Sequence, residues 1–246
     1  GTFSTHRWCP LFALGGQGLQ IQLTLADPAD SLVKQGTTYT DQFSLHDIKL
    51  LADLCTLNDD LQSSFNSALL AGSALRIPIK SWETVVNYLP SDSGGNFDVP
   101  ISKNYTRLAT LFAIFNQNPP TDGEGTAKIV NTSYFPTANA EDFEYYLQLG
   151  TRRMPDHAVQ GVSESWHRLQ NALGIGQSLA HTSSISQSAY RSNKFMLSQD
   201  CERLPMLMAS GENLSTGQTI FLKVKNCGTG QSTVPRRVTV CMHFEK

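Results

Sequence analysis

Apolar and polar residues alternate along much of the chain, and this period of two is typical of β-strands with one buried face. In LQIQLTLA, Leu19, Ile21, Leu23 and Leu25 fall on one face, and glutamine and threonine side chains occupy the other. The same alternation predicts strands at 143–149, 219–226 and 236–244. Shorter runs of this kind predict further strands at 75–79, 81–89, 96–102 and 194–200.

Two longer apolar segments depart from simple alternation. RLATLFAIFNQ (107–117) is apolar on both faces, which favours a central strand inside the core. FSLHDIKLLADLCTL (43–57) changes phase between Leu45 and Ile48, which indicates a β-bulge. We therefore expect about eight to ten strands in all.

Two segments have helical spacing. Residues 58–72 begin with Asn58 and two aspartates, carry apolar residues one turn apart, and end at Gly72. A second helix is expected at about 155–173, because its apolar residues recur at spacings of 3, 4, 3 and 4, and Gly174 follows them as a cap. The predicted core face of this helix consists of Val159, Val162, Trp166, Leu169 and Leu173.

Many strands, two helices and frequent glycine- and proline-containing turns predict an all-β antiparallel sandwich or barrel, with the helices in its connections. No internal repeat or convincing linker interrupts residues 19–246, so we expect one domain there. Residues 1–18 are expected to form an N-terminal extension or linker.

Composition narrows the functional classes. The net charge of -2 gives no electrostatic case for strong nucleic-acid binding. Charged residues make up 16% of the chain, which suits either a surface covered by partners or an ordinary β-rich surface. The five cysteines have no C-x-x-C spacing and suggest reduced thiols in the cytosol or nucleus. No apolar run is long enough to predict a membrane span.

The segment at 155–173 also carries residue types found in hydrolases. Ser163, Glu164 and His167 lie within one turn of each other, but one helix cannot place the third member of a triad on the far side of the imidazole. Glu164 and Arg168 have the i, i+4 spacing of a helical ion pair. We therefore interpret this face as solvated, or as a subunit contact, and predict no catalytic residue.

Metal and cofactor sites are not predicted either. The six histidines form no metal-binding spacing, such as H-E-x-x-H. The glycine-rich GGQG at 15–18 lacks the lysine and the following helix of a phosphate-binding loop. These observations favour a structural or binding protein over an enzyme.

Three segments, in order, resemble motifs of one protein family. They are FSLHDIKLLADLCTLNDDL, then YYLQL followed by GTRRMPDHAVQGVSESWHRLQNALG, then KFMLSQDCERLPMLMASGENLSTGQTIFLKVKN. Together they resemble the double jelly-roll major capsid proteins of DNA viruses, in the group of polinton-like viruses, adintoviruses and virophages. The similarity is to the C-terminal jelly roll of those proteins.

This resemblance implies a jelly roll, with 58–72 as a helix in an early connection, that assembles as a homotrimer into an icosahedral capsid beside neighbouring subunits. It implies a virion protein, assembled in the host cytoplasm or nucleus and not secreted, without catalysis or cofactor. Asp200 and Glu202 match the family motif. The residues matched to turns and caps are Gly174, Gly211, Asn213 and Gly217, where asparagine and glycine tolerate left-handed backbone.

The resemblance leaves several alternatives open. Family members usually carry two jelly rolls, so this chain is a fragment, a partner of a separate jelly-roll chain, or a solitary descendant. A minor or penton capsid protein is a related alternative. A carbohydrate- or receptor-binding module would use exposed aromatic residues such as Trp8 and Trp82 for stacking.

Overall fold

The computed structural model describes residues 9–14, 18–25, 43–73, 80–88, 95–103, 107–116, 142–175, 184–202, 211–214, 217, 219–227 and 237–245. Backbone contacts divide the chain into two compact units. One is Phe3–Pro78, and the other is Ile79–Lys246 together with Gly1–Thr2. Trp8 and the strand expected at 75–79 fall outside the described residues.

The described part of the N-terminal unit contains a short 3-10 helix, η1 (Leu11–Ala13), and the α-helix α2 (Asp59–Leu70). The Asn58 side chain caps α2 by accepting a hydrogen bond from the Asp60 N–H at 3.4 Å. The helix expected at 58–72 is therefore confirmed, with ends within two residues of those predicted.

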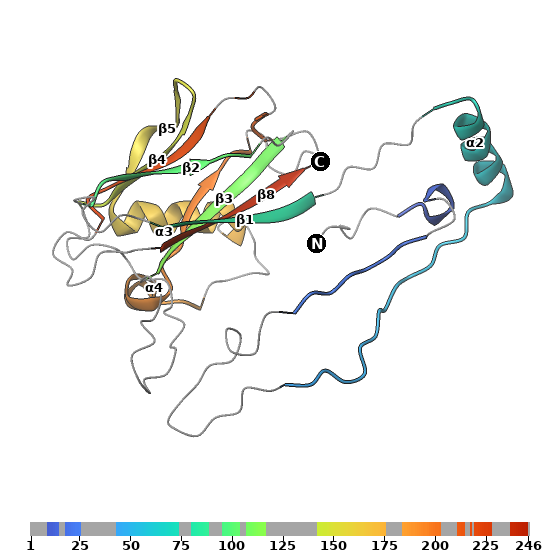
Figure 1. The fold of residues 1–246 in the computed structure, drawn as a ribbon, viewed down its shortest axis with the longest axis horizontal. Helices are drawn as coiled ribbons and strands as arrows, with labels where there is room; N and C mark the ends of the chain where they lie inside the picture. Colours follow the sequence, from blue (N-terminus) through green and yellow to red (C-terminus); the bar gives the residue numbers. More distant parts are fainter. Residues whose placement is uncertain are drawn as a thin grey trace. The chain divides into compact units, whose positions relative to one another are not determined.

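The strands expected at 19–25 and 43–57 are not assigned as strands. Both segments lie in the N-terminal unit as lengths of chain without a ladder partner (Figure 1). Their alternation is real, but a strand also needs a hydrogen-bonded neighbour. Without a ladder, the β-bulge predicted there is absent too, although Asp47, at the predicted change of phase, has a positive φ of 53°. The apolar side chains of both segments, including Ile21 and Leu51, are exposed.

The C-terminal unit is a sandwich of two four-stranded antiparallel sheets (Figure 1). Sheet A has the order β1-β8-β3-β6, and sheet B has the order β2-β7-β4-β5. The strands are β1 (Lys80–Tyr88), β2 (Phe97–Ile101), β3 (Arg107–Asn116), β4 (Glu144–Leu149), β5 (Arg152–Gln160), β6 (Leu197–Asp200), β7 (Ile220–Lys225) and β8 (Arg237–Glu245). The predicted all-β sandwich is thereby confirmed.

Seven of these strands fall where alternation or a continuous apolar run predicts them. The side chains alternate as expected, and β2 is buried at every second residue. The inward-facing residues of both sheets form one core, and β3 contributes the fully buried Leu108, Leu111 and Phe115. Within this core, Phe195 contacts Phe143 and Tyr190 with ring centroids 5.6 and 5.3 Å apart.

The helix expected at 155–173 begins later than predicted. Residues up to Gln160 belong to β5, and the helix α3 spans Gly161–Ala172. Val159 is therefore a strand residue, paired with Tyr145 of β4 and fully buried. Gly161 makes the change from strand to helix, since its φ of 73° is readily adopted only by glycine.

A further helix, α4 (Gln187–Asn193), lies between α3 and β6 and was not predicted from the sequence. Its seven residues give too short a window for helical periodicity to be recognised. Ser186 caps it by accepting a hydrogen bond from the Ala189 N–H at 3.2 Å. Both α3 and α4 thus lie in the connection between β5 and β6 (Figure 1).

Candidate functional site

The hydrolase-like side chains of α3 make structural contacts. Glu164 accepts a hydrogen bond from the backbone N–H of Gln160 at 3.0 Å, so it satisfies a free donor at the start of the helix. Its other oxygen accepts from Arg168 at 3.2 Å, which confirms the predicted i, i+4 pair. His167 is hydrogen-bonded to Asn171 at 3.0 Å. These contacts give Glu164 and His167 structural partners within and next to α3.

The predicted core face of α3 is correct in its middle and wrong at its end. Val162 and Leu169 are buried. Trp166 is half-buried and packs edge-on against Tyr190, with ring centroids 4.7 Å apart. Leu173 is 50% exposed and is not a core residue, because the last helical turn ends at Ala172 and Leu173 is its C-cap.

The four predicted turn residues differ in backbone conformation. Gly174, with φ 68°, and Gly217, with φ 71°, have the left-handed backbone that favours glycine. Gly174 follows the C-cap of α3 and donates to the Asn171 carbonyl at 3.0 Å. Asn213 is exposed and has no positive φ, so the left-handed conformation considered for it is not present. The asparagine with that conformation is Asn226, at φ 57°.

Gly211 has a different role, because it lets one turn reach both sheets. A Cβ at Gly211 would lie 3.0 Å from the Leu108 carbonyl oxygen of β3, and its φ is 132°. The next residue, Glu212, exchanges two backbone hydrogen bonds with Leu108, at 2.8 and 2.9 Å. Its carboxylate makes a two-point ion pair with Arg152 of β5, at 3.0 and 3.1 Å. Glu212 therefore ties sheet A to sheet B.

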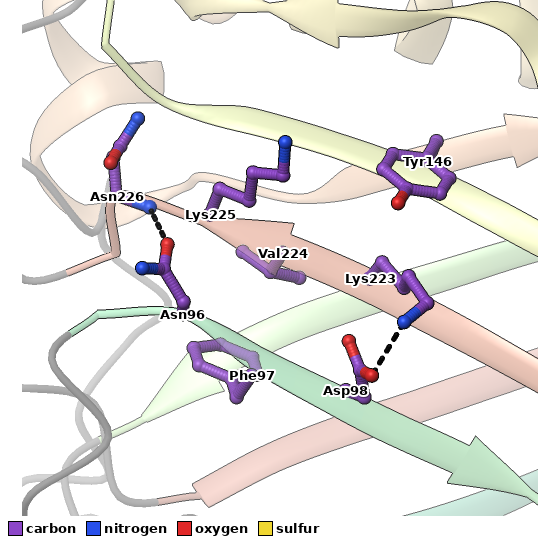
Figure 2. A pocket seen from close by; sticks show the side chains of 8 residues that line it. All are labelled: Asn96, Phe97, Asp98, Tyr146, Lys223, Val224, Lys225 and Asn226. Carbon is purple, nitrogen blue, oxygen red and sulfur yellow. Dashed lines mark hydrogen bonds and ion pairs between the residues drawn. The ribbon is translucent and has the colours of Figure 1, made fainter.

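A shallow groove of about 630 Å³ crosses the outer surface of sheet B (Figure 2). It is lined by Asn96, Phe97, Asp98, Tyr146, Lys223, Val224, Lys225 and Asn226. The residues come from β2, β7 and β4 and from the turns that flank β2 and β7. Nothing in the local sequence indicates this groove, because the strands that form it are brought together only by pairing.

The charged side chains at this groove are paired with each other. The Lys223 ammonium lies 2.6 Å from the Asp98 carboxylate, opposite it in the register of β2 and β7 (Figure 2). Lys225 reaches Glu144 of β4 at 3.5 Å. The Asn96 side chain accepts a hydrogen bond from the Asn226 N–H at 3.0 Å (Figure 2). Both lysines of the groove are thus engaged in ion pairs with neighbouring strands, and Asn96 is hydrogen-bonded to the backbone of Asn226.

The outer surface of sheet A is aromatic. Trp82 of β1 stacks on His243 of β8, with ring centroids 4.5 Å apart, and on Phe112 of β3 at 5.9 Å. Burial, together with the nearby Lys80 ammonium, lowers the pKa of His243. A neutral imidazole is therefore favoured beneath the indole, although Trp82 itself remains half exposed.

The other shifted pKa values belong to groups that are buried or half-buried. Burial raises the pKa of the Tyr145 and Tyr190 hydroxyls, which donate to the carbonyls of Ser198 and Met196 at 3.0 and 2.9 Å. Burial likewise raises the pKa of the Cys201 thiol, against the direction that activates a nucleophile. Burial also raises the pKa of the Asp200 carboxyl, which accepts a hydrogen bond from the Glu202 N–H at 2.9 Å.

Within the described residues, no three metal-ligating side chains gather into a cluster. No helix in that part of the chain is long and apolar enough to cross a membrane. Comparison with known proteins gives no matching family model and no matching curated sequence. The functional argument therefore depends on the fold, the contacts described above and the resemblance of the sequence motifs.

Proposed function

We propose that this chain is a structural subunit of an icosahedral viral capsid, built on a jelly roll, and that it works by packing without catalysis. The observation that carries this proposal is the nested strand order. The first strand, β1, pairs with the last, β8, and β2 pairs with β7. A jelly roll is a two-sheet sandwich of eight strands, built from two Greek keys. The nested pairing of β1 with β8 and of β2 with β7 supports this topology.

The connections support the same proposal. The capsid-protein resemblance implies a helix near the top of the roll that begins after a strand and ends at glycine. Here α3 leaves β5 at Gly161 and is followed by Gly174, both with positive φ. The third resembling motif contains Gly211 and Glu212, and the contacts of Glu212 join the two sheets.

The chemistry of the described surface also suits a packing role. Glu164, Arg152 and Lys223 each take part in an ion pair within the domain. The pair of Glu164 lies within α3, whereas those of Arg152 and Lys223 join different segments. The acidic and thiol groups with shifted pKa values are shifted mainly by burial. These ion-paired and buried groups stabilise the folded subunit. Assembly of folded subunits then requires only complementary surfaces.

The test is the assembly state of the full chain under reducing conditions. Native mass spectrometry should give a discrete oligomer, expected to be a trimer, and negative-stain electron microscopy should show rings, arrays or shells. A chain that remains monomeric over a wide range of concentration and salt would contradict the proposal. Mass measurement also reveals whether a second jelly-roll chain is needed, since particles would then form only when that chain is present.

A core variant separates assembly from aggregation. Leu147 lies fully buried in β4, so Leu147→Asp places a charge in the core and should unfold the sandwich. Discrete oligomers must disappear in this variant. If particles of the same size persist, they do not arise from the folded subunit, and the capsid interpretation fails.

A further inference from the structure

The sandwich has four strands at the edges of its two sheets, among the strands that the structure describes. They are β1 and β6 in sheet A, and β2 and β5 in sheet B. An edge strand presents unpaired backbone donors and acceptors, and these can pair with another chain. Proteins that avoid such pairing shorten the edge, interrupt it, charge it or cover it.

Three of the four edges are interrupted or short. β2 has five residues and contains Pro100, which cannot donate to a ladder. β5 contains Pro155 and charged residues such as Arg152 and Arg153, and its register with β4 is broken between Tyr145 and Leu147. β6 has only four residues and lies against α3.

The β1 edge is neither short nor interrupted, although it carries two charged residues, Lys80 and Glu83. It runs for nine residues without proline, and its register with β8 is unbroken from Lys80 to Tyr88. Four large apolar side chains are strongly exposed in the described part of the C-terminal unit, and three of them lie on β1. Trp82 is 54% exposed, Val86 40% and Tyr88 66%. This concentration on one strand marks β1 as a pairing surface.

We propose that the open edge of β1 pairs, antiparallel and across a two-fold axis, with β1 of a second copy of this chain. The strand is complementary to itself. Pairing centred on Thr84 places Trp82 opposite Val86, and pairing centred on Val85 places Trp82 opposite Tyr88. Aromatic residues opposite β-branched or aromatic residues are favourable cross-strand pairs.

The charges of β1 allow the same arrangement. Its two charged residues are Lys80 and Glu83. When the pairing is centred on Thr84, Lys80 lies opposite Tyr88 and Glu83 opposite Val85, so like charges never face each other. The stack of Trp82 on His243 also holds the largest side chain in place before the partner arrives, which lowers the entropic cost of association.

The resulting contact would join sheet A of two subunits into one continuous sheet of eight strands. This contact gives one surface of the proposed capsid subunit a partner, namely a second copy of the same chain. The inference rests on the proposed function only because it assumes that the chain self-assembles. Icosahedral shells contain two-fold axes, so an isologous contact of this kind has a natural place in them.

The test uses the full chain and a single charge on the exposed row. Val86→Lys puts an ammonium group between the apolar side chains of both copies, so it should raise the dissociation constant of self-association about tenfold or more. Leu173→Lys is the matched control, since it changes a similarly exposed apolar residue outside β1. Val86→Thr keeps the β-branched shape and should retain association.

Two measurements read the outcome. Sedimentation velocity over a range of concentrations gives the affinity, and circular dichroism confirms that each variant is folded. Residue-resolved hydrogen exchange should show slow exchange in the associated wild type at those β1 amides that point away from β8. In Val86→Lys the same amides should exchange rapidly, while amides paired with β8 stay protected.

The results distinguish this inference from the proposed function. If wild type and Val86→Lys form particles equally well, the β1 pairing is wrong and the capsid role stands. If Val86→Lys abolishes a dimer while no larger assembly ever forms, the pairing stands and the capsid role fails. A wild type that stays monomeric overturns the pairing, and slow exchange at its β1 edge would then identify another segment of the same chain as the cover.

Discussion

Replacing Phe195 by alanine should strongly destabilise the sandwich. The Phe195 side chain is fully buried, and its ring contacts Phe115, Phe143 and Tyr190 at centroid distances of 6.1, 5.6 and 5.3 Å. Truncating a buried phenylalanine to alanine costs about 3–5 kcal/mol, because apolar contacts are lost and a cavity remains. Each aromatic pair contributes roughly 0.5–1.5 kcal/mol beyond the effect of its buried surface area. These contributions overlap with the cost of truncation and are not added to it. We expect a loss of about 4 kcal/mol.

Chemical denaturation, monitored by tryptophan fluorescence and by circular dichroism, measures this loss directly. A thermal melt gives a second reading, since about 4 kcal/mol should lower the melting temperature by roughly 8–16 °C in a domain of this size. Phe195→Leu keeps most of the volume and should cost about 1.5 kcal/mol or less. Phe221→Ala is the external control, because Phe221 lies half-buried on the outer surface of sheet B.

The order of the three variants decides the result. If Phe195→Ala is no more destabilising than Phe221→Ala, then the Phe195 ring does not fill the core and the packing described for it is wrong. If Phe195→Leu is as damaging as Phe195→Ala, the ring contacts dominate over volume, and the cavity argument must be replaced by one based on aromatic geometry.

Three other substitutions test separate features of the fold. Trp166→Ala should cost about 2–3 kcal/mol by denaturation, less than for a fully buried tryptophan, since Trp166 is half-buried against Tyr190; no measurable change would place its ring in solvent. Gly211→Ala should cost about 1–3 kcal/mol because its φ of 132° disfavours any Cβ, and an unchanged midpoint would mean that the turn can rearrange. Burial lowers the pKa of His243, so the unfolded state binds more protons and stability should fall as pH drops through about 6.5; His243→Phe should flatten this slope, and an equal slope in both proteins would exclude His243 as its source.

Most strands of the sandwich could be predicted from the sequence because alternation is a local property. β7 shows it well, since Ile220, Leu222 and Val224 are buried and the residues between them are not. The same rule failed at 19–25, where the alternation is equally clear but the described structure supplies no strand partner. Local pattern gives the faces of a strand, whereas pairing depends on chain that is distant in sequence.

The boundary between β5 and α3 shows a second limit. Val159 fits the apolar spacing of the helix, yet it is also a good β residue and pairs with Tyr145. The deciding residue was Gly161, which the sequence presents as an ordinary glycine within a helical run. Only its positive φ reveals that the chain changes from strand to helix there.

The contacts that join the sheets were beyond local prediction as well. The predicted Glu164–Arg168 pair is confirmed because helix geometry fixes the distance between residues four apart. The Arg152–Glu212 pair joins two segments far apart in sequence, and no local rule brings them together. The resemblance motif pointed to Gly211 and Asn213 as turn residues and passed over Glu212, which makes the contacts.

The nested strand order also dictates when this protein can fold during synthesis. Lys80 at the start of β1 pairs with Glu245 at the end of β8, so the sandwich cannot close until residues 237–245 have left the ribosome. Pairings between such distant segments form slowly, because the loop between them must be ordered first. Until then β1 exposes both of its edges and the apolar row of Trp82, Val86 and Tyr88. The nascent chain therefore has its greatest need of chaperones in the interval between the synthesis of β1 and that of β8.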